Sequence, residues 1–180
     1  MKSVLIHSCC THCAAYTIDY WRQQGYEVSA LWYNPNIHPY TEYQQRLAAM
    51  KSLAQKINLP LIITDNYDMI SYFRKVAGHE SQRCQYCFRL RLSKTAETAR
   101  QAGFNAFTTT LLISPHQKHN LLQEIGNKLA QEQGIDFLYA DLRKRYSDSR
   151  CMTKRLNLYR QQYCGCVYSE WERLTNQTIL

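Results

Sequence analysis

The chain has 180 residues, of which 45% are hydrophobic, and it carries a formal net charge of +8 at pH 7. This length and composition predict a single domain over residues 1–180 with a sizeable core, and the lack of a long apolar run excludes a membrane-spanning helix. The apolar run near the start, residues 4–6, is too short for a signal peptide, so we expect a cytosolic protein.

Strand-like and helix-like segments alternate along the first half of the chain. The apolar run at 3–8 predicts a buried strand, and a helix follows at 14–24, with Gly25 placed to end it. A second strand is expected at 27–33. Thr41 and Gln44 have capping-box spacing at the start of a helix over 41–57, which Pro60 separates from a third strand at 61–64. Another helix is expected at 67–76.

The second half continues the alternation. A helix starts near Cys84 and ends at Gly103, a strand follows at 106–112, and a helix at 116–133 ends at Gly134. A short strand at 137–140 and a helix at 154–163 complete the predicted elements. This order predicts an α/β fold, Rossmann-like, with a mostly parallel sheet flanked by helices. In such folds ligands bind at the carboxyl ends of the strands.

Seven of the eight cysteines fall into three groups, and Cys151 stands alone. The groups are Cys9, Cys10 and Cys13; Cys84 and Cys87; and Cys164 and Cys166. In a reducing compartment, clustered thiols are metal ligands or catalytic groups more often than a disulfide framework. The first group follows the first predicted strand, where nucleotide-binding folds carry a glycine-rich loop. No GxGxxG or GxxxxGK[ST] motif is present, so we expect no ATP or NAD and a metal at this loop instead.

Five thiols from the first two groups can meet at one crevice. A tetrahedral zinc needs four ligands, and a [4Fe–4S] cluster needs four, or three with an open iron position. The surplus thiol favours a cluster with a second ion, or a cluster with a catalytic thiol. A single structural zinc that ties the loops together is the alternative. Residue types alone do not separate zinc from iron–sulfur here.

Two further features lie near the expected metal site. Cys164 and Cys166 flank one glycine and are predicted to form a strained, redox-active disulfide, the alternatives being extra metal ligands or inert buried thiols. His38 lies between two prolines in the loop after the second strand. It could donate a proton to a substrate, or it could cap a backbone carbonyl.

The positive charge favours a polyanionic partner, with nucleic acid the first candidate. Fourteen tyrosines and three tryptophans offer stacking surfaces for unstacked bases. A solvated basic surface is the alternative. Two local clusters of basic residues stand out, one from Arg83 to Lys94 and one at 143–145, and the phosphate contacts predicted from them are Arg83, Arg89, Arg91, Arg143, Lys144 and Arg145.

The ordered motifs resemble the QueH family of epoxyqueuosine reductases along nearly the whole chain. They are CCTHC (9–13), YNPNIHP (33–39), EYQQR (42–46), RCQYCFRLRL (83–92), TTLLISPHQ (109–117), DLRKRY (141–146) and YRQQYCGCVYS (159–169). Family members usually carry Ala-Pro where this chain has Thr11-His12, and tyrosine where it has Phe88 and His116. No departure removes a cysteine.

The resemblance implies a HUP-like fold in which cysteines replace the phosphate loop. It implies a [4Fe–4S] cluster with a second metal ion, iron or zinc, and no cobalamin. It also implies reduction of the epoxide of epoxyqueuosine in the tRNA anticodon loop to queuosine, the last step of queuosine biosynthesis, with electrons from an external donor. We expect Cys9, Cys10, Cys13, Cys84 and Cys87 to hold the metals, Cys164 and Cys166 to relay reducing equivalents, and His38 or Tyr163 to supply protons.

Two rival functions remain open. One is another iron–sulfur tRNA-modifying enzyme, such as a thiolase of the ATP-pyrophosphatase type, which the missing SGGxDS loop disfavours. The other is a zinc-stabilised tRNA-binding module without enzymatic activity.

Overall fold

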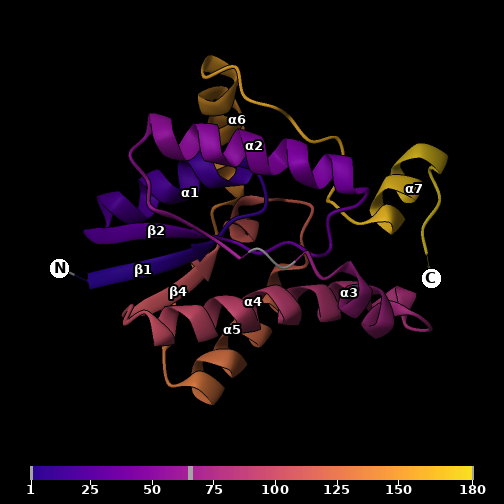
Figure 1. Cartoon of the computed structure of the whole chain (residues 1–180), viewed down its shortest axis with the longest axis horizontal. Coiled ribbons are helices and arrows are strands. Elements are labelled where there is room, and N and C mark those ends of the chain that lie inside the picture. Colours follow the sequence, from indigo (N-terminus) through magenta and orange to yellow (C-terminus); the bar gives the residue numbers. More distant parts are fainter. Residues whose placement is uncertain (1, 65–66, 180) are drawn as a thin grey trace.

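The computed structural model, which describes residues 2–64 and 67–179, has an α/β fold (Figure 1). Its five strands form one parallel sheet in the order β3–β2–β1–β4–β5. The strands are β1 (Lys2–His7), β2 (Tyr26–Trp32), β3 (Leu61–Ile63), β4 (Ala106–Thr109) and β5 (Asp136–Phe137). The predicted mostly parallel sheet is therefore confirmed.

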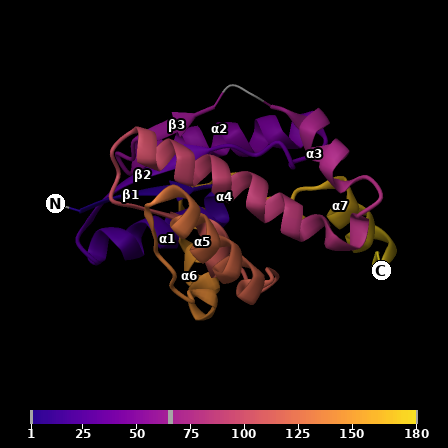
Figure 2. The ribbon, with the colours of Figure 1, turned by 90° about the horizontal axis from the view of Figure 1, so that it is seen from below.

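Helices cover both faces of the sheet (Figures 1 and 2). On one face lie α1 (Thr11–Gln23), α2 (Tyr40–Lys56) and α6 (Tyr146–Arg155), and on the other lie α4 (Arg83–Gln101) and α5 (His119–Gln133). The remaining described helices are α3 (Met69–Val76) and α7 (Val167–Thr175), with 3-10 turns η1 (Glu80–Gln82), η2 (Thr110–Ile113) and η3 (Arg143–Arg145). No described helix combines the length and apolar character needed to cross a membrane.

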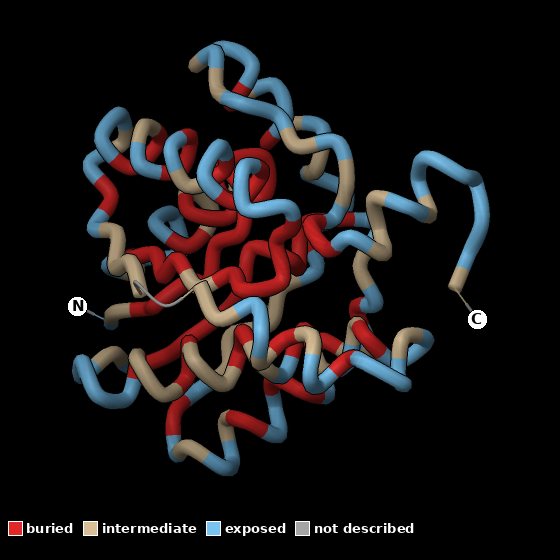
Figure 3. Tube along the Cα trace, turned by 45° about the vertical axis from the view of Figure 1, so that its right-hand side comes forward, coloured by how far each residue is buried: buried red, intermediate tan, exposed pale blue. Residues whose placement is uncertain are grey.

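The core is divided between the two faces because side chains alternate along each strand. On β1, Val4 and Ile6 face α1 and α2, whereas Leu5 faces α4 and α5, and all three are fully buried. In Figure 3 the buried backbone runs through the middle of the molecule, and exposed residues concentrate on the outer helices. The central strand is therefore apolar on both sides, as expected for a parallel sheet covered twice.

The carboxyl end of β1 leads directly into the first cysteine group. His7 ends the strand, and α1 begins at Thr11 with Cys10 in extended conformation as its N-cap. His7 also pairs with Leu31 of β2 and Thr109 of β4, so three strands end at this level. The loop that carries Cys9 and Cys10 therefore lies at the carboxyl edge of the sheet, where the fold class predicts a ligand site.

Several predicted elements differ from the structure in extent. The helix expected at 116–133 begins only at His119, and the strand expected at 137–140 is β5 at Asp136–Phe137. The strand expected at 106–112 ends at Thr109, whose hydroxyl accepts a hydrogen bond from Leu111 N and starts η2. The helix expected at 154–163 is instead α6, which ends at Arg155 before Asn157 adopts a positive φ of 51°. Glu42 and Arg46 of α2 form hydrogen bonds with residues 159–164, and these tertiary contacts outweigh the local helical pattern.

Candidate metal centre and active site

A cavity of about 530 Å³ opens at the carboxyl ends of β1 and β4. Four of its lining residues are cysteines: Cys9, Cys10, Cys13 and Cys164. The other lining residues are mostly polar or basic: His12, Leu111, Ser114, His116, Gln117, Tyr146, Arg150, Arg160, Gln161, Gln162, Tyr163, Ser169 and Arg173. The first and third cysteine groups thus meet here, although about 150 residues separate them along the chain.

The three thiols of the first group interact with one another. Cys9 and Cys10 have Sγ atoms 3.9 Å apart, and Cys13 lies one helical turn further on. All three are at most 5% exposed. Hydrogen bonds from the thiols of Cys10 and Cys13 lower the pKa of Cys9 well below its ordinary value, against the effect of burial. The same sharing raises the pKa of Cys13. This group is therefore suited to hold one thiolate between two thiols.

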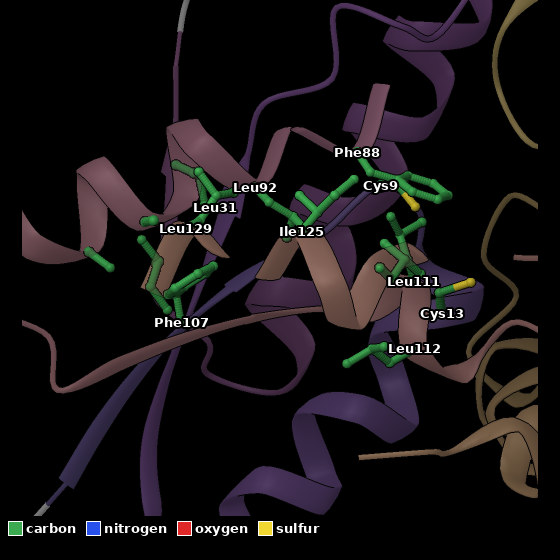
Figure 4. Close-up of a cluster of buried hydrophobic side chains, with 14 of the residues drawn as sticks. Cys9, Cys13, Leu31, Phe88, Leu92, Phe107, Leu111, Leu112, Ile125 and Leu129 are labelled. Atoms are coloured by element: carbon green, nitrogen blue, oxygen red, sulfur yellow. The ribbon is translucent and has the colours of Figure 1, made fainter. Parts of the chain in front are cut away.

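The second group lies at the start of α4. Cys87 is buried and packs with Cys166, Tyr72 and Val76 in a neighbouring cluster, while Cys84 packs against the cluster that contains Cys9. Figure 4 shows Cys9 beside Phe88 of α4. The structure therefore brings the two groups close together without placing Cys84 or Cys87 on the cavity wall.

The third group lies on a loop that other segments hold in place. Gly165 accepts a hydrogen bond from His38 N (2.8 Å), and a Cβ at Gly165 would lie 3.2 Å from Ile37. Its φ of 151° also favours glycine between the two cysteines.

All eight cysteines are free thiols in this structure, so the disulfide predicted for Cys164 and Cys166 is not formed here. Gln117 Nε2 donates to Cys164 Sγ at 3.3 Å.

Arg91 is the buried cation among these thiols. Its side chain is 1% exposed, its Nε donates to the carbonyl of Cys87, and its Nη2 has no hydrogen-bond partner. Among the described residues it makes no ion pair with a carboxylate. Burial works against the charge, but the negative charges that Cys87, Cys9 and Cys164 carry when ionised raise the pKa of Arg91 above its ordinary value. The counter-charge of this guanidinium must therefore come from sulfur or from something that sulfur binds.

The residue types around the cavity, and not a preformed geometry, are those that an anionic metal group held by thiolates would require. Within residues 2–64 and 67–179, no three His, Cys, Asp or Glu side chains already surround one point closely enough to hold a metal ion. The fit rests instead on seven thiols from three segments and on the unpartnered Nη2 of Arg91 beside them. A cluster ligated by thiolates carries negative charge and accepts hydrogen bonds at its sulfurs.

The prediction that His38 donates a proton to a substrate is not supported. Its ring is 5% exposed and does not line the cavity. The ring stacks on Phe73 at 4.6 Å, and its Nε2 lies 3.1 Å from the carbonyl oxygen of Pro35. Burial lowers the pKa of His38 to about 4, so the ring is neutral at pH 7. The structure favours the carbonyl-capping role. Tyr163 does line the cavity, and its hydroxyl donates to the carbonyl of His38.

We expect acidification from pH 6.5 to pH 4 to destabilise the protein. The pKa of His38 is lower in the folded state than in the unfolded chain, so its contribution to stability is present above pH 6.5 and is lost as the pH falls towards 4. Burial also lowers the pKa values of His7 and His12 to about 4, which adds to the effect. Urea unfolding between pH 7.5 and 4.5 measures it.

The matched variant is His38→Phe, which can keep the stacking on Phe73 but does not titrate. Its stability should depend less steeply on pH than that of the unsubstituted protein. Equal slopes would contradict the assignment of a buried neutral ring, and an NMR titration of the His38 ring gives an independent check.

Arg91 was wrongly predicted as a phosphate contact, because a side chain that is 1% exposed does not reach a bound RNA. Arg83 is also buried and binds Glu172 at 2.6 Å. Three other predicted contacts are exposed but already paired: Arg89 with Glu132, Arg143 with Asp141 and Arg145 with Asp148. Lys144 is exposed. Most of the predicted contacts would therefore have to give up a carboxylate before binding phosphate.

The cations on the cavity wall were not among the predicted contacts. They are Arg150, Arg160 and Arg173, from α6, the following segment and α7. Neither local charge cluster contains them, and only the return of residues 159–173 to the sheet edge brings them together. Arg160 lies within the motif YRQQYCGCVYS, which is the one signal in the sequence that could have identified it.

Comparison with known proteins gives one consistent family. The family model described as epoxyqueuosine reductase QueH matches residues 4–172. An epoxyqueuosine reductase QueH from Dehalococcoides mccartyi is 53% identical over 170 residues, covering 94% of this chain and 93% of that protein. Another, from Thermotoga maritima, is 34% identical over 183 residues, covering 96% of this chain and 93% of that protein.

A solved structure supports the fold alone. It is a crystal structure described as a predicted subunit of a tRNA methyltransferase from Methanocaldococcus jannaschii. The match has a TM-score of 0.56 at 12% identity and covers 86% of this chain and 75% of that one. At this identity the likeness concerns the arrangement of the Rossmann-like sheet and helices.

Proposed function

The chain belongs to the epoxyqueuosine reductase QueH family, and on this premise we propose that it reduces the epoxide of epoxyqueuosine in tRNA to give queuosine. The observation that carries the proposal is the cavity at the sheet edge, where four thiols line one wall and a buried arginine without a carboxylate lies close by. Removal of an epoxide oxygen as water takes two electrons and two protons and leaves an alkene. The electrons come from an external donor.

We propose that Cys9, Cys10, Cys13, Cys84 and Cys87 hold a [4Fe–4S] cluster and a second ion, iron or zinc. Bound there, the metals supply single electrons and a Lewis acid for the epoxide oxygen. The lowered pKa of Cys9 supports its role as a ligand, because only a thiolate binds metal. Arg91 would offset the negative charge of the metal group from the buried side.

Other cavity residues would position the substrate and control protons. Gln161 Nε2 donates to Cys10 Sγ at 2.9 Å, and Gln117 donates to Cys164, so two amides orient sulfur atoms. Burial raises the pKa of Tyr163, so its phenol keeps its proton at pH 7. In this structure the hydroxyl donates that proton to the carbonyl of His38, and its oxygen can still accept a hydrogen bond. We propose Cys164 and Cys166 as the thiol pair that relays reducing equivalents, since Cys164 lines the cavity and Cys166 lies near Cys87.

The decisive experiment combines metal analysis with turnover. Protein purified without oxygen should contain about four irons and four sulfides per chain, plus additional metal. With a chemical reductant and tRNA bearing epoxyqueuosine, it should form queuosine without ATP. A colourless protein with one zinc and no turnover, even after anaerobic reconstitution, would support the RNA-binding module instead, and a requirement for ATP would support the thiolase type.

A further inference from the structure

A second cavity of about 410 Å³ adjoins the first. Three residues, His12, Arg150 and Arg160, line both cavities and form the boundary between them. Only the second is lined by Ser147, Cys151, Lys154, Asn157 and Leu158, from α6 and the turn that follows it. The two sites therefore adjoin at these three residues, which come from the first turn of α1, from α6 and from the segment after α6.

The second cavity presents cations that have no counter-charge. Arg150, Lys154 and Arg160 are exposed, and none makes an ion pair within the part of the chain that the structure describes. Among residues 2–64 and 67–179, no aspartate or glutamate lines either cavity. By contrast, Arg143 and Arg145, just before α6, are each paired with a carboxylate. The free cations of this region are thus concentrated where the two cavities meet.

The boundary between the cavities is held in place. His12 lies in the first turn of α1, is 5% exposed and has its Nδ1 3.3 Å from the hydroxyl of Thr153 on α6. His12 lines both cavities together with Arg150 and Arg160, so the boundary joins α1, α6 and the segment after α6. Because α1 also carries Cys13, the thiol wall and the second cavity share one rigid element.

The chemistry of the lining suits a nucleotide. Three cations supply contacts for phosphate, Asn157 and Ser147 supply hydrogen-bonding groups, and Leu158 supplies an apolar surface for a ribose or base. A volume of about 410 Å³ lies within the range of small-molecule sites. A nucleotide here would lie directly beside whatever occupies the thiol-lined cavity.

We propose that the second cavity binds the nucleotide adjacent to the modified one in the RNA substrate. Arg150 and Arg160 contact the phosphate that joins the two nucleotides, and Lys154 contacts the next phosphate. The inference rests on the proposed function, since it requires that the modified base enter the first cavity. It assigns recognition of the RNA strand to α6 and the turn after it, and not to the arginines paired with carboxylates, Arg83, Arg89, Arg143 and Arg145.

Lys154 provides the test because it lines the second cavity only. The variant Lys154→Gln should weaken binding of an anticodon stem–loop RNA about fivefold. The slope of log K against log salt, which is negative, should decrease in magnitude by about 0.7. Since Lys154 is exposed, the variant should fold normally. In turnover, KM for the RNA should rise and kcat should stay the same.

The matched control is Arg155→Gln, the next residue on α6, which is exposed and lines neither cavity. Equal affinity, salt slope and KM for the two variants would overturn the inference while leaving the reductase assignment intact. The reverse failure is also distinguishable, because absence of turnover by the unsubstituted protein would remove the premise. A free nucleoside monophosphate is the second ligand to measure. If Lys154→Gln weakened binding of the nucleoside monophosphate but not of the stem–loop RNA, the cavity would bind a small molecule and not the RNA strand.

Discussion

Replacement of Arg46 by methionine is expected to lower the free energy of unfolding by about 3–5 kcal/mol, the range for removing one partner of a buried ion pair. Arg46 is 1% exposed and its Nε lies 2.7 Å from Glu42 Oε1 on the same helix. Its two Nη atoms donate to the carbonyl oxygens of Cys164 (2.9 Å) and Tyr163 (3.1 Å). The variant would leave a buried carboxylate without its cation and two carbonyls without their donors.

The Arg46 variant should also lose structure mainly in residues 159–164, the segment that lines the thiol-containing cavity. Glu42 accepts a hydrogen bond from the hydroxyl of Tyr159, so the Glu42–Arg46 pair fastens residues 159–164 to α2. In hydrogen exchange, amides of this segment should lose more protection in the variant than amides of the central strands. Denaturant unfolding and exchange measured by mass spectrometry give the two results.

Arg22→Met is the matched control. Arg22 also donates to two carbonyls, those of Ile57 and Asn58, but it is exposed and has no buried carboxylate partner. Its loss should cost no more than about 1–2 kcal/mol. If the two variants were equally stable, the Glu42–Arg46 pair would not be what attaches residues 159–164 to α2.

Replacement of Arg91 by methionine is expected to leave folding nearly unchanged but to reduce metal retention and reductase activity roughly 10- to 100-fold, the usual cost of losing a residue that supports metal ligands. Arg91 differs from Arg46 because no carboxylate of the described protein depends on it. Removing an unpaired buried cation should therefore not destabilise the metal-free protein, and methionine can fill the space beside Phe88.

Three measurements separate these effects: denaturant unfolding of the metal-free protein, iron content after reconstitution and turnover. The control is Arg89→Met, two residues earlier on α4, where the side chain is exposed and paired with Glu132. It should retain iron and activity. If Arg91→Met kept full iron content and turnover, the guanidinium would not balance the charge of a metal group. If the metal-free variant unfolded much more readily, Arg91 would be a structural residue.

The pattern of strands and helices was readable from the sequence because it depends on local periodicity. Alternating βα units predicted the parallel sheet, and the position of Cys9 and Cys10 after the first strand predicted a site at its carboxyl edge. The helix at 154–163 could not be predicted correctly. The segment after Arg155 is not helical, and the carbonyls of Tyr163 and Cys164 accept hydrogen bonds from Arg46 of α2, an interaction that no local pattern encodes.

The roles of the charged residues required the tertiary structure. Arg89 and Arg91 stand two positions apart in the same motif, yet one is exposed and paired whereas the other is buried among thiols. The difference arises from which face of α4 each occupies, and from which segments cover that face. Arg150 and Arg160 were not predicted as phosphate contacts from the sequence. They lie together in the structure because the chain after α6 passes beside His12 at the start of α1.

The sequence by itself determined the fold class and the family, together with the residue types available for the chemistry, since these follow from periodicity and from ordered motifs. Only the tertiary structure decided which cysteines share a cavity, that His38 is a buried neutral ring, and which of the described cations on the cavity walls have no carboxylate partner. The physical reason is that burial and pairing are set by contacts between segments far apart in the chain. Those contacts determine whether a given side chain carries charge, donates a proton or supports another residue.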